Sequence, residues 1–185
     1  TRFFQSNDMS VREVIPSLSP SMDIQVSSNF ERLLFELCDR NGEQTEEIMT
    51  EFQATGSMPL SSELFEKTKA CFHGFSLNDT ESVKAMRSWN KRLHDHVDPH
   101  SVTALEHARH YGSENHPTVA LSTAHPAKFP AAARLAFGSI PPMPGALTDL
   151  FQKDEMFVRL PNDVKQVTQW IAKRVNDNRS NDERG

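Results

Sequence analysis

Residues 119–130 read Val-Ala-Leu-Ser-Thr-Ala-His-Pro-Ala-Lys-Phe-Pro, so an apolar run ends in side chains that can do chemistry. Ser122 and Thr123 supply adjacent hydroxyls, which both donate and accept hydrogen bonds. His125 and the cation Lys128 follow within the same stretch. The hydroxyls predict a ligand contact at the end of a strand, although capping of the following turn would also explain them. Lys128 lies either near this site or on a solvated helix turn.

A second polar group opens a predicted helix. Ser27, Ser28 and Asn29 precede an apolar pattern of helical spacing, and Ser28 with Glu31 has the spacing of a capping box. Free backbone amides at a helix start, together with hydroxyls, suit a phosphate group. Plain helix capping explains the same residues equally well.

Five of the eight histidines lie in one stretch, at positions 94, 96, 100, 107 and 110. The spacing of His94, His96 and His100 could suggest a metal site. We predict none, because no cysteine or carboxylate completes a set of ligands with the usual spacing.

Composition limits the class of protein. The 185 residues carry a formal net charge of -5, with 24% charged and 37% hydrophobic residues, as in an ordinary soluble globular chain. No basic stripe predicts nucleic-acid binding. No apolar run is long enough for a membrane span, and Cys38 and Cys71 are predicted to be reduced core thiols. These features predict a cytoplasmic protein without nucleic-acid or membrane partners.

Two kinds of periodicity alternate along the chain. Strands are predicted at residues 11–15, 70–75, 117–122 and 157–160. Helices are predicted at residues 28–37, 43–55, 79–94, 99–111, 130–137 and 162–175, with Gly56 and Gly112 ending two of them. Asp98 before Pro99 is predicted to cap the helix 99–111, since Asp can cap a helix whose first residue is a proline. This alternation predicts an α/β fold with a parallel, doubly wound sheet flanked by helices. Ser122 and Thr123 then lie at the carboxyl end of a strand, where such sheets bind ligands.

Three stretches carry a resemblance to a known family. They are Ser-Pro-Ser-Met-Asp-Ile-Gln-Val-Ser-Ser-Asn-Phe-Glu-Arg-Leu-Leu-Phe-Glu at 19–36, Val-Asp-Pro-His-Ser-Val-Thr-Ala-Leu-Glu-His-Ala at 97–108, and Leu-Ser-Thr-Ala-His-Pro-Ala-Lys-Phe-Pro at 121–130. Together they resemble the carboxyl-terminal portion of threonine synthase, in the longer form of that enzyme. The resemblance is close over 1–40 and 97–137, looser to about 176, and poor between the two close regions.

The resemblance implies a fold and an activity. Threonine synthase is a fold-type II enzyme, like the beta subunit of tryptophan synthase, and uses pyridoxal 5'-phosphate to convert O-phospho-L-homoserine and water to L-threonine and phosphate. By this similarity Thr123 contacts the pyridine nitrogen of the cofactor, with Ser122 as the alternative. Ser27, Ser28, Asn29, His125 and Lys128 are then candidates for binding the substrate.

The resemblance also shows what this stretch does not carry. In the family, the lysine that holds the cofactor lies upstream in a Phe-Lys-Asp type motif, as does a glycine-rich phosphate loop. Neither is present here, because Lys128 does not match that lysine and the seven glycines never cluster. We therefore expect residues 1–176 to be the carboxyl-terminal portion of a catalytic domain, 177–185 to be a polar tail, and an amino-terminal part of the same protein to be missing.

One departure and two alternatives remain. After Arg2-Phe3-Phe4 the family usually shows Thr-Gly-x-Tyr, whereas this chain has Gln5-Ser6-Asn7-Asp8-Met9, which alters a turn near the site. The sequence is therefore compatible with a related phospho-lyase that releases a keto acid. It is also compatible with a non-catalytic fragment of the same fold.

Overall fold

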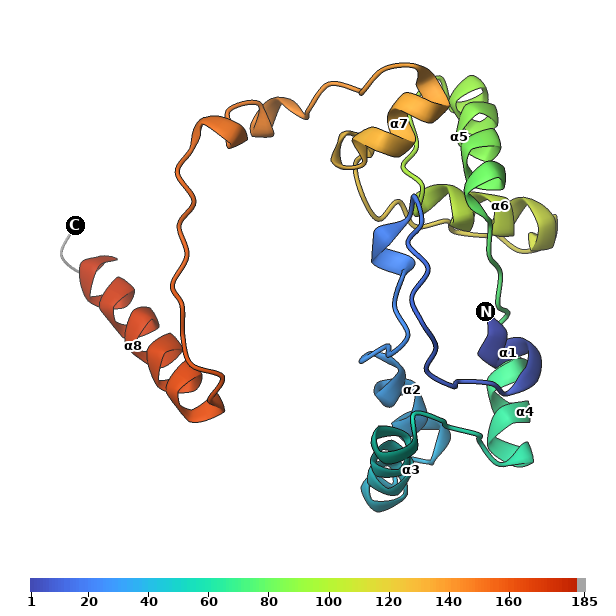
Figure 1. Ribbon diagram of the computed structural model, residues 1–185, viewed down its shortest axis with the longest axis vertical. Helices are drawn as coiled ribbons and strands as arrows, with labels where there is room; N and C mark the ends of the chain where they lie inside the picture. Colours follow the sequence, from blue (N-terminus) through green and yellow to red (C-terminus); the bar gives the residue numbers. More distant parts are fainter. Residues whose placement is uncertain (183–185) are drawn as a thin grey trace. The chain divides into compact units, whose positions relative to one another are not determined.

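The computed structural model describes residues 1–182 and divides into two compact units, Thr1–Pro142 and Met143–Gly185 (Figure 1). The helices of the first unit are α1 (Arg2–Ser6), α2 (Phe30–Leu37), α3 (Gly42–Thr55), α4 (Ser62–Cys71), α5 (Asp79–Leu93), α6 (Ser101–Tyr111) and α7 (Pro130–Phe137), with 3-10 turns η1 (Pro20–Met22) and η2 (Pro126–Lys128). The second unit holds η3 (Gly145–Leu147), η4 (Leu150–Gln152) and α8 (Val164–Asp182). None of the described helices is long and apolar enough to cross a membrane.

The sheet predicted from the sequence does not form within residues 1–182. The only β-type pairing there is an isolated bridge between Ser113 and His116. Residues 11–15, 117–122 and 157–160 are non-helical but have no strand partner, and residue 71 still belongs to α4. An apolar segment becomes a strand only when a neighbouring strand takes its backbone hydrogen bonds. Such a partner is lacking here, and Val119 and Leu121 remain 80% and 69% exposed.

The helix predictions fared better. Helices are confirmed close to the expected residues 43–55, 79–94 and 130–137, and Gly56 ends α3 with φ 67°, the left-handed conformation that glycine adopts readily. The predicted capping box of Ser28 and Glu31 is wrong, since α2 begins two residues later with Asn29 as its N-cap and no side-chain cap bond. A capping box occurs instead at Asn78 and Glu81, where each side chain accepts from the other's backbone N–H.

Gly112 does end a helix, through a close approach of backbone groups. A Cβ atom at Gly112 would lie 2.4 Å from the Ala108 carbonyl oxygen, a distance that no side chain tolerates. The Gly112 N–H donates to that same carbonyl at 2.8 Å. The chain can therefore leave α6 tightly at this point and enter the segment that carries Ser122 and Thr123.

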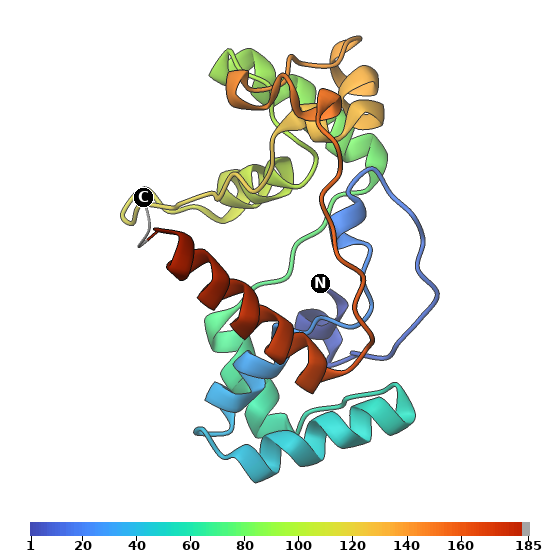
Figure 2. The same ribbon diagram turned by 90° about the vertical axis from the view of Figure 1, so that its left-hand side faces the viewer.

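Two hydrophobic clusters hold the first unit together. One gathers α1 to α4 around buried side chains, namely Phe3, Leu34, Leu37, Cys38, Phe52, Met58, Leu60 and Leu64. The other joins α5, α6 and α7, and its buried side chains are Ala85, Met86, Val97, Val102, Phe129, Ala132 and Ala136. Figures 1 and 2 show these two groups of helices at different heights within the unit. The second cluster supports the candidate site.

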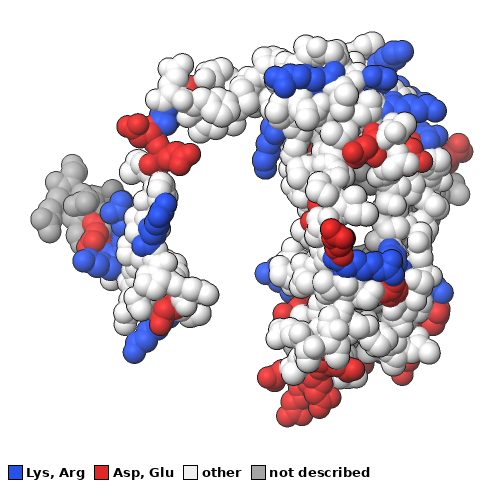
Figure 3. Space-filling view, in the orientation of Figure 1, with Lys and Arg blue, Asp and Glu red and all other residues white. Residues whose placement is uncertain are grey.

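Charge and thiols are distributed unevenly over the first unit. Acidic side chains gather over α3 at one end of the face seen in Figure 3, and basic side chains gather toward α5 and α7. Both cysteines are free thiols, but only Cys38 is buried, so the prediction of two core thiols is wrong for the exposed Cys71.

Phe3 gives a test of the first cluster. It is 4% exposed, and its ring meets Phe4, Phe30 and Phe65 edge-on at centroid distances of 5.2, 4.9 and 5.8 Å. We expect Phe3→Ala to lower the free energy of unfolding by about 3–5 kcal/mol, because it removes a buried ring and leaves a cavity. Urea denaturation measures this loss. Phe72→Ala is the control, since Phe72 is 47% exposed; an equal loss in both variants would contradict the packing described.

Candidate functional site

A buried turn before α6 organises the candidate site. Asp98 is 1% exposed, and its Oδ1 atom accepts hydrogen bonds from the backbone N–H of His100 at 2.9 Å and of Ser101 at 3.4 Å. His100 Nδ1 lies 3.0 Å from the same oxygen. Asp98 Oδ2 has no hydrogen-bond partner among the described residues. The prediction that Asp98 is the N-cap is wrong, because His100 holds that position, but the Asp98 carboxylate does accept the amides of His100 and Ser101 at the start of α6.

The tautomer of His100 follows from its two contacts. Its Nε2 atom accepts a hydrogen bond from the backbone N–H of Ser21 at 3.2 Å, so this nitrogen carries no proton. The proton of the neutral ring is then on Nδ1, which donates it to Asp98. Asp98 and His100 together tie the turn of η1 to the start of α6.

The same turn holds the segment that carries the predicted cofactor contact. The backbone N–H of Thr123 donates to Ser101 Oγ at 2.9 Å, and Ser101 is 2% exposed. Ser19 Oγ donates to the Pro99 carbonyl oxygen at 3.2 Å. Segments near residues 20, 100 and 123, which are far apart in sequence, therefore meet at one buried network.

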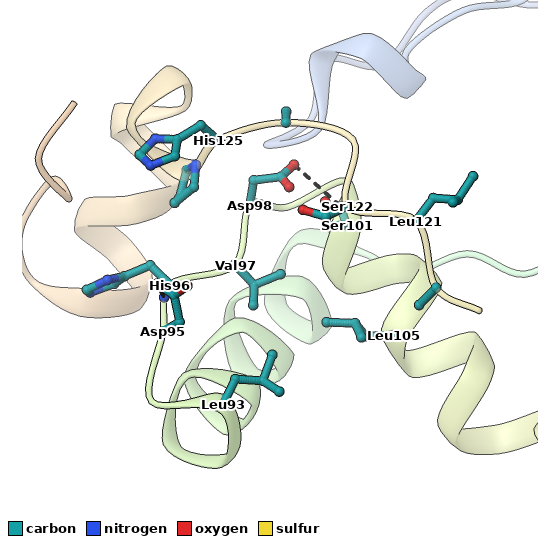
Figure 4. A pocket seen from close by; sticks show the side chains of 13 residues that line it. Leu93, Asp95, His96, Val97, Asp98, Ser101, Leu105, Leu121, Ser122 and His125 are labelled. Carbon is teal, nitrogen blue, oxygen red and sulfur yellow. Dashed lines mark hydrogen bonds between the residues drawn. The ribbon is translucent and has the colours of Figure 1, made fainter. Parts of the chain in front are cut away.

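Ser122 and Thr123 contribute to two different cavities. Ser122 lines a cavity of about 270 Å³ together with Asp98 and His125 (Figure 4). Thr123 lines another of about 440 Å³ together with His100 and His107. Successive side chains of an extended chain point to opposite faces, which accounts for the separation. A single bound group can therefore meet only one of the two hydroxyls closely.

The cavity beside Thr123 has groups that would suit an aromatic ligand. His107 Nε2 is buried without a hydrogen-bond partner, and the Thr123 hydroxyl makes no hydrogen bond within residues 1–182. Phe75, Val119 and Leu121 add apolar surface. Its volume lies within the range of small-molecule sites. An aromatic ring with a polar atom at its edge fits this combination.

The other predicted site residues are dispersed. His125 lines the smaller cavity, and its Nδ1 atom accepts from the Ala127 N–H at 3.2 Å, which leaves Nε2 as the protonated nitrogen of a neutral ring. Lys128 is exposed, with Nζ 5.8 Å from the Phe129 ring centroid, and lines neither cavity. Ser27, Ser28 and Asn29 lie before α2 and also line neither cavity, so the structure does not gather them with Thr123.

Most members of the histidine-rich stretch pack as aromatic rings. His96 lies edge-on to Phe137 at 4.6 Å, and His100 lies 4.4 Å from Phe129. His107 contacts Tyr111 at a centroid distance of 4.9 Å. Within residues 1–182 no group of three or more histidine, cysteine or carboxylate side chains could hold a metal ion.

Glu106 lies on α6 between Leu105 and His107, which line the smaller and the larger cavity. Burial raises its pKa, but hydrogen bonds from Arg109 at 2.7 and 3.0 Å and from Trp89 Nε1 at 2.7 Å outweigh burial and hold the pKa below its ordinary value of 4.5. The ionised form is thus favoured in the folded state. This interaction stabilises the fold above pH 4.5 and is lost as the pH falls through the lower, folded-state pKa.

Glu106→Gln should remove this pH dependence. We expect the free energy of unfolding of the variant to be lower by about 1–2 kcal/mol at pH 7; the loss is modest because Arg109 is partly exposed and solvent screens the pair. The loss should be smaller at pH 3, where the Glu106 carboxylate is closer to its protonated form. Urea denaturation at both pH values measures the difference. Glu114→Gln provides a control at an exposed position. A deficit of equal size at both pH values would contradict the assigned interaction.

The comparisons with known proteins agree with the motifs. Residues 101–171 match the family model described as threonine synthase, C-terminal. The chain is 36% identical over 177 residues to the threonine synthase of Pseudomonas aeruginosa, covering 95% of this chain and 38% of that protein. It is 32% identical over 160 residues to human threonine synthase-like 2, covering 83% of this chain and 32% of that protein.

A solved structure shows the same relationship. The pyridoxal-phosphate-bound threonine synthase from Brucella melitensis aligns with a TM-score of 0.77 and 36% identity, over 92% of this chain and 37% of that one. This neighbour is a pyridoxal-phosphate enzyme of fold type II, and the fold of the chain resembles part of it. Within this class the chain is similar to the carboxyl-terminal portion of threonine synthases, which confirms the resemblance read from its motifs. It spans less than two fifths of the length of these relatives.

Proposed function

We propose that this chain supplies the carboxyl-terminal part of a threonine synthase, which converts O-phospho-L-homoserine and water to L-threonine and phosphate. The observation that carries the proposal is the placement of Thr123: its backbone is fixed on the buried Ser101, and its side chain lines the cavity of about 440 Å³. The match to threonine synthases over 95% of this chain supports the same conclusion.

Thr123 is the proposed partner of the cofactor's pyridine nitrogen. Pyridoxal phosphate supplies an electron sink for the reaction. The Thr123 hydroxyl would donate to the ring nitrogen and leave it largely unprotonated, because an alcohol is a far weaker acid than a carboxylic acid. Ser122 faces the smaller cavity and becomes the less favoured candidate.

The part of the complete enzyme outside this chain would supply the remaining catalytic groups. We propose that the cofactor-binding lysine and the glycine-rich loop belong to that part, and that residues 1–185 are inactive alone. The same part would pair with residues 117–122, whose apolar side chains are exposed, and so build the parallel, doubly wound sheet. Residues 1–176 would belong to this one catalytic domain, with 177–185 as a polar tail.

We propose two groups of residues for substrate binding. The backbone amides at the start of α2, with Ser27, Ser28 and Asn29, would bind or admit the substrate's phosphate. His125 and Lys128 would contribute donors near the Thr123 segment. We further propose a cytoplasmic location, consistent with two cysteines that are both free thiols.

An assay on the longest natural product of the gene tests the proposal. We expect O-phospho-L-homoserine to yield L-threonine and phosphate in equal amounts. The departure at residues 5–9 from the family's usual Thr-Gly-x-Tyr leaves one alternative, a related phospho-lyase that releases a keto acid and no threonine. Keto acid as the main product would support that alternative. No turnover of any phosphorylated substrate would indicate a non-catalytic fragment of the fold.

A further inference from the structure

The smaller cavity contains a carboxylate oxygen that lacks a partner. Asp98 Oδ2 is buried, lines this cavity of about 270 Å³, and accepts no hydrogen bond within the described residues. All three hydrogen bonds to the side chain go to Oδ1. A buried acceptor without a donor is costly, and more so when it is charged. Oδ2 therefore marks a place for a donor that enters from the cavity.

Hydroxyl donors lie close to this acceptor. Ser101 Oγ accepts a hydrogen bond from the Thr123 N–H, but its own proton has no acceptor among residues 1–182. Ser122 lines the same cavity, and its hydroxyl makes no hydrogen bond within that part of the chain. Figure 4 shows Asp98, Ser101 and Ser122 together at one side of the cavity. The site thus combines one anionic acceptor with two free hydroxyl donors.

The rest of the lining selects among ligands that could use these groups. Apolar side chains make up much of the wall, namely Leu93, Val97, Leu105, Ala120, Leu121, Ala124 and Pro126. Asp95 adds a second carboxylate, which favours a cationic group over an anionic one near Asp98. A ligand that fits has an ammonium group, a group that accepts hydrogen bonds from hydroxyls, and a short aliphatic body.

We propose that this cavity binds a small aliphatic α-amino acid. Its ammonium group donates to Asp98 Oδ2, and its carboxylate accepts from Ser101 and Ser122. The site is separate from the proposed cofactor contact, because Thr123 lines the other cavity. It rests on the groups of the cavity itself and holds whether or not the complete protein makes threonine.

Calorimetric titration with L-2-aminobutyrate tests the proposal without any turnover. In the longest natural product of the gene, we expect L-2-aminobutyrate to bind at least about tenfold more tightly than butyrate, which lacks the ammonium, or propylamine, which lacks the carboxylate. Asp98→Asn should weaken binding about tenfold or more, because Oδ1 can keep its partners while the amide NH2 that replaces Oδ2 is a donor and cannot accept from the ammonium. Glu114→Gln removes the same charge at an exposed position and should change nothing.

Several outcomes would overturn the proposal. Equal binding of butyrate and L-2-aminobutyrate would remove the role of the ammonium group, and full affinity in Asp98→Asn would remove the role of Oδ2. Should Asp98→Asn not fold, Ser101→Ala and Ser122→Ala must each weaken binding. Binding to residues 1–185 that is absent in the longest gene product would mean that a group of the longer chain occupies the cavity beside Asp98. That outcome would equally refute a free amino acid as the ligand.

Discussion

Residues 1–185, incubated with pyridoxal phosphate and reduced with borohydride, are expected to carry no stoichiometric adduct on any one lysine. A lysine that binds the cofactor covalently must be unprotonated at neutral pH, which requires burial or a neighbouring cation to lower its pKa. The described lysines are Lys67, Lys69, Lys84, Lys91, Lys128, Lys153, Lys165 and Lys173, and none of them is buried. The chain alone should also produce no threonine.

Lys67 shows why the lysines of this chain cannot take the place of a cofactor-binding lysine. It is the least exposed of them, yet its hydrogen bond to Glu63 at 3.3 Å and its proximity to Asp39 raise its pKa above the ordinary value of 10.5. The protonated form is favoured there, so Lys67 is a poorer nucleophile than a free lysine. Its carboxylate partners work against covalent catalysis.

Mass spectrometry of the reduced and digested chain measures the adduct. Scattered, substoichiometric labelling of exposed lysines is expected, and the longest natural product of the gene provides the positive control. One lysine labelled to completion in residues 1–185, with the absorbance of a bound cofactor, would refute the proposal that this chain lacks its catalytic lysine.

The helices could be predicted from the sequence because their signals are local. Gly56 ends α3, and Pro130 begins α7, through preferences of the residues themselves. The short α1, Arg2–Ser6, was not predicted from the sequence, and neither was the longer α4, Ser62–Cys71. Its amphipathic pattern is short, and its end was read as the strand 70–75. Packing of Leu64 in the first cluster decides in favour of helix.

The sheet could not be established in the same way, because strand pairing is not a local property. The apolar run at 117–122 is compatible with a strand, but its backbone needs a partner that residues 1–182 do not provide. A sequence pattern predicts that a segment can form a strand, but it does not show which strand would pair with it.

The cofactor contact at Thr123 stays a prediction. The sequence could not show that Ser122 and Thr123 line different cavities, and the structure adds this distinction. The roles of Asp98 and Ser101 were missed. Asp98 was interpreted as a helix cap from its Asp-Pro spacing, and nothing in that spacing shows that one carboxylate oxygen stays without a partner.

Replacing Thr123 in the complete enzyme should change turnover more than stability. Thr123→Val removes the hydroxyl but keeps the backbone N–H that donates to Ser101, so the segment stays anchored. Losing one hydrogen bond to a buried ring nitrogen costs about 1–3 kcal/mol, or roughly a 5- to 150-fold loss of kcat if the bond is needed in the transition state. Thr123→Ser keeps the hydroxyl and should retain most of the activity.

Thr123→Asp separates an electronic role of this residue from a structural one. A carboxylate at this position would raise the pKa of the pyridine nitrogen and favour its protonated form, which should alter the absorbance spectrum of the bound cofactor. Ser101→Ala is the matched probe of the anchor, because it removes the acceptor of the Thr123 N–H and leaves the Thr123 hydroxyl in place. Steady-state kinetics, cofactor spectra and thermal unfolding distinguish these roles. If Thr123→Val and Thr123→Asp shifted only thermal stability, with kcat and spectra unchanged, Thr123 would cap the turn and would not contact the cofactor.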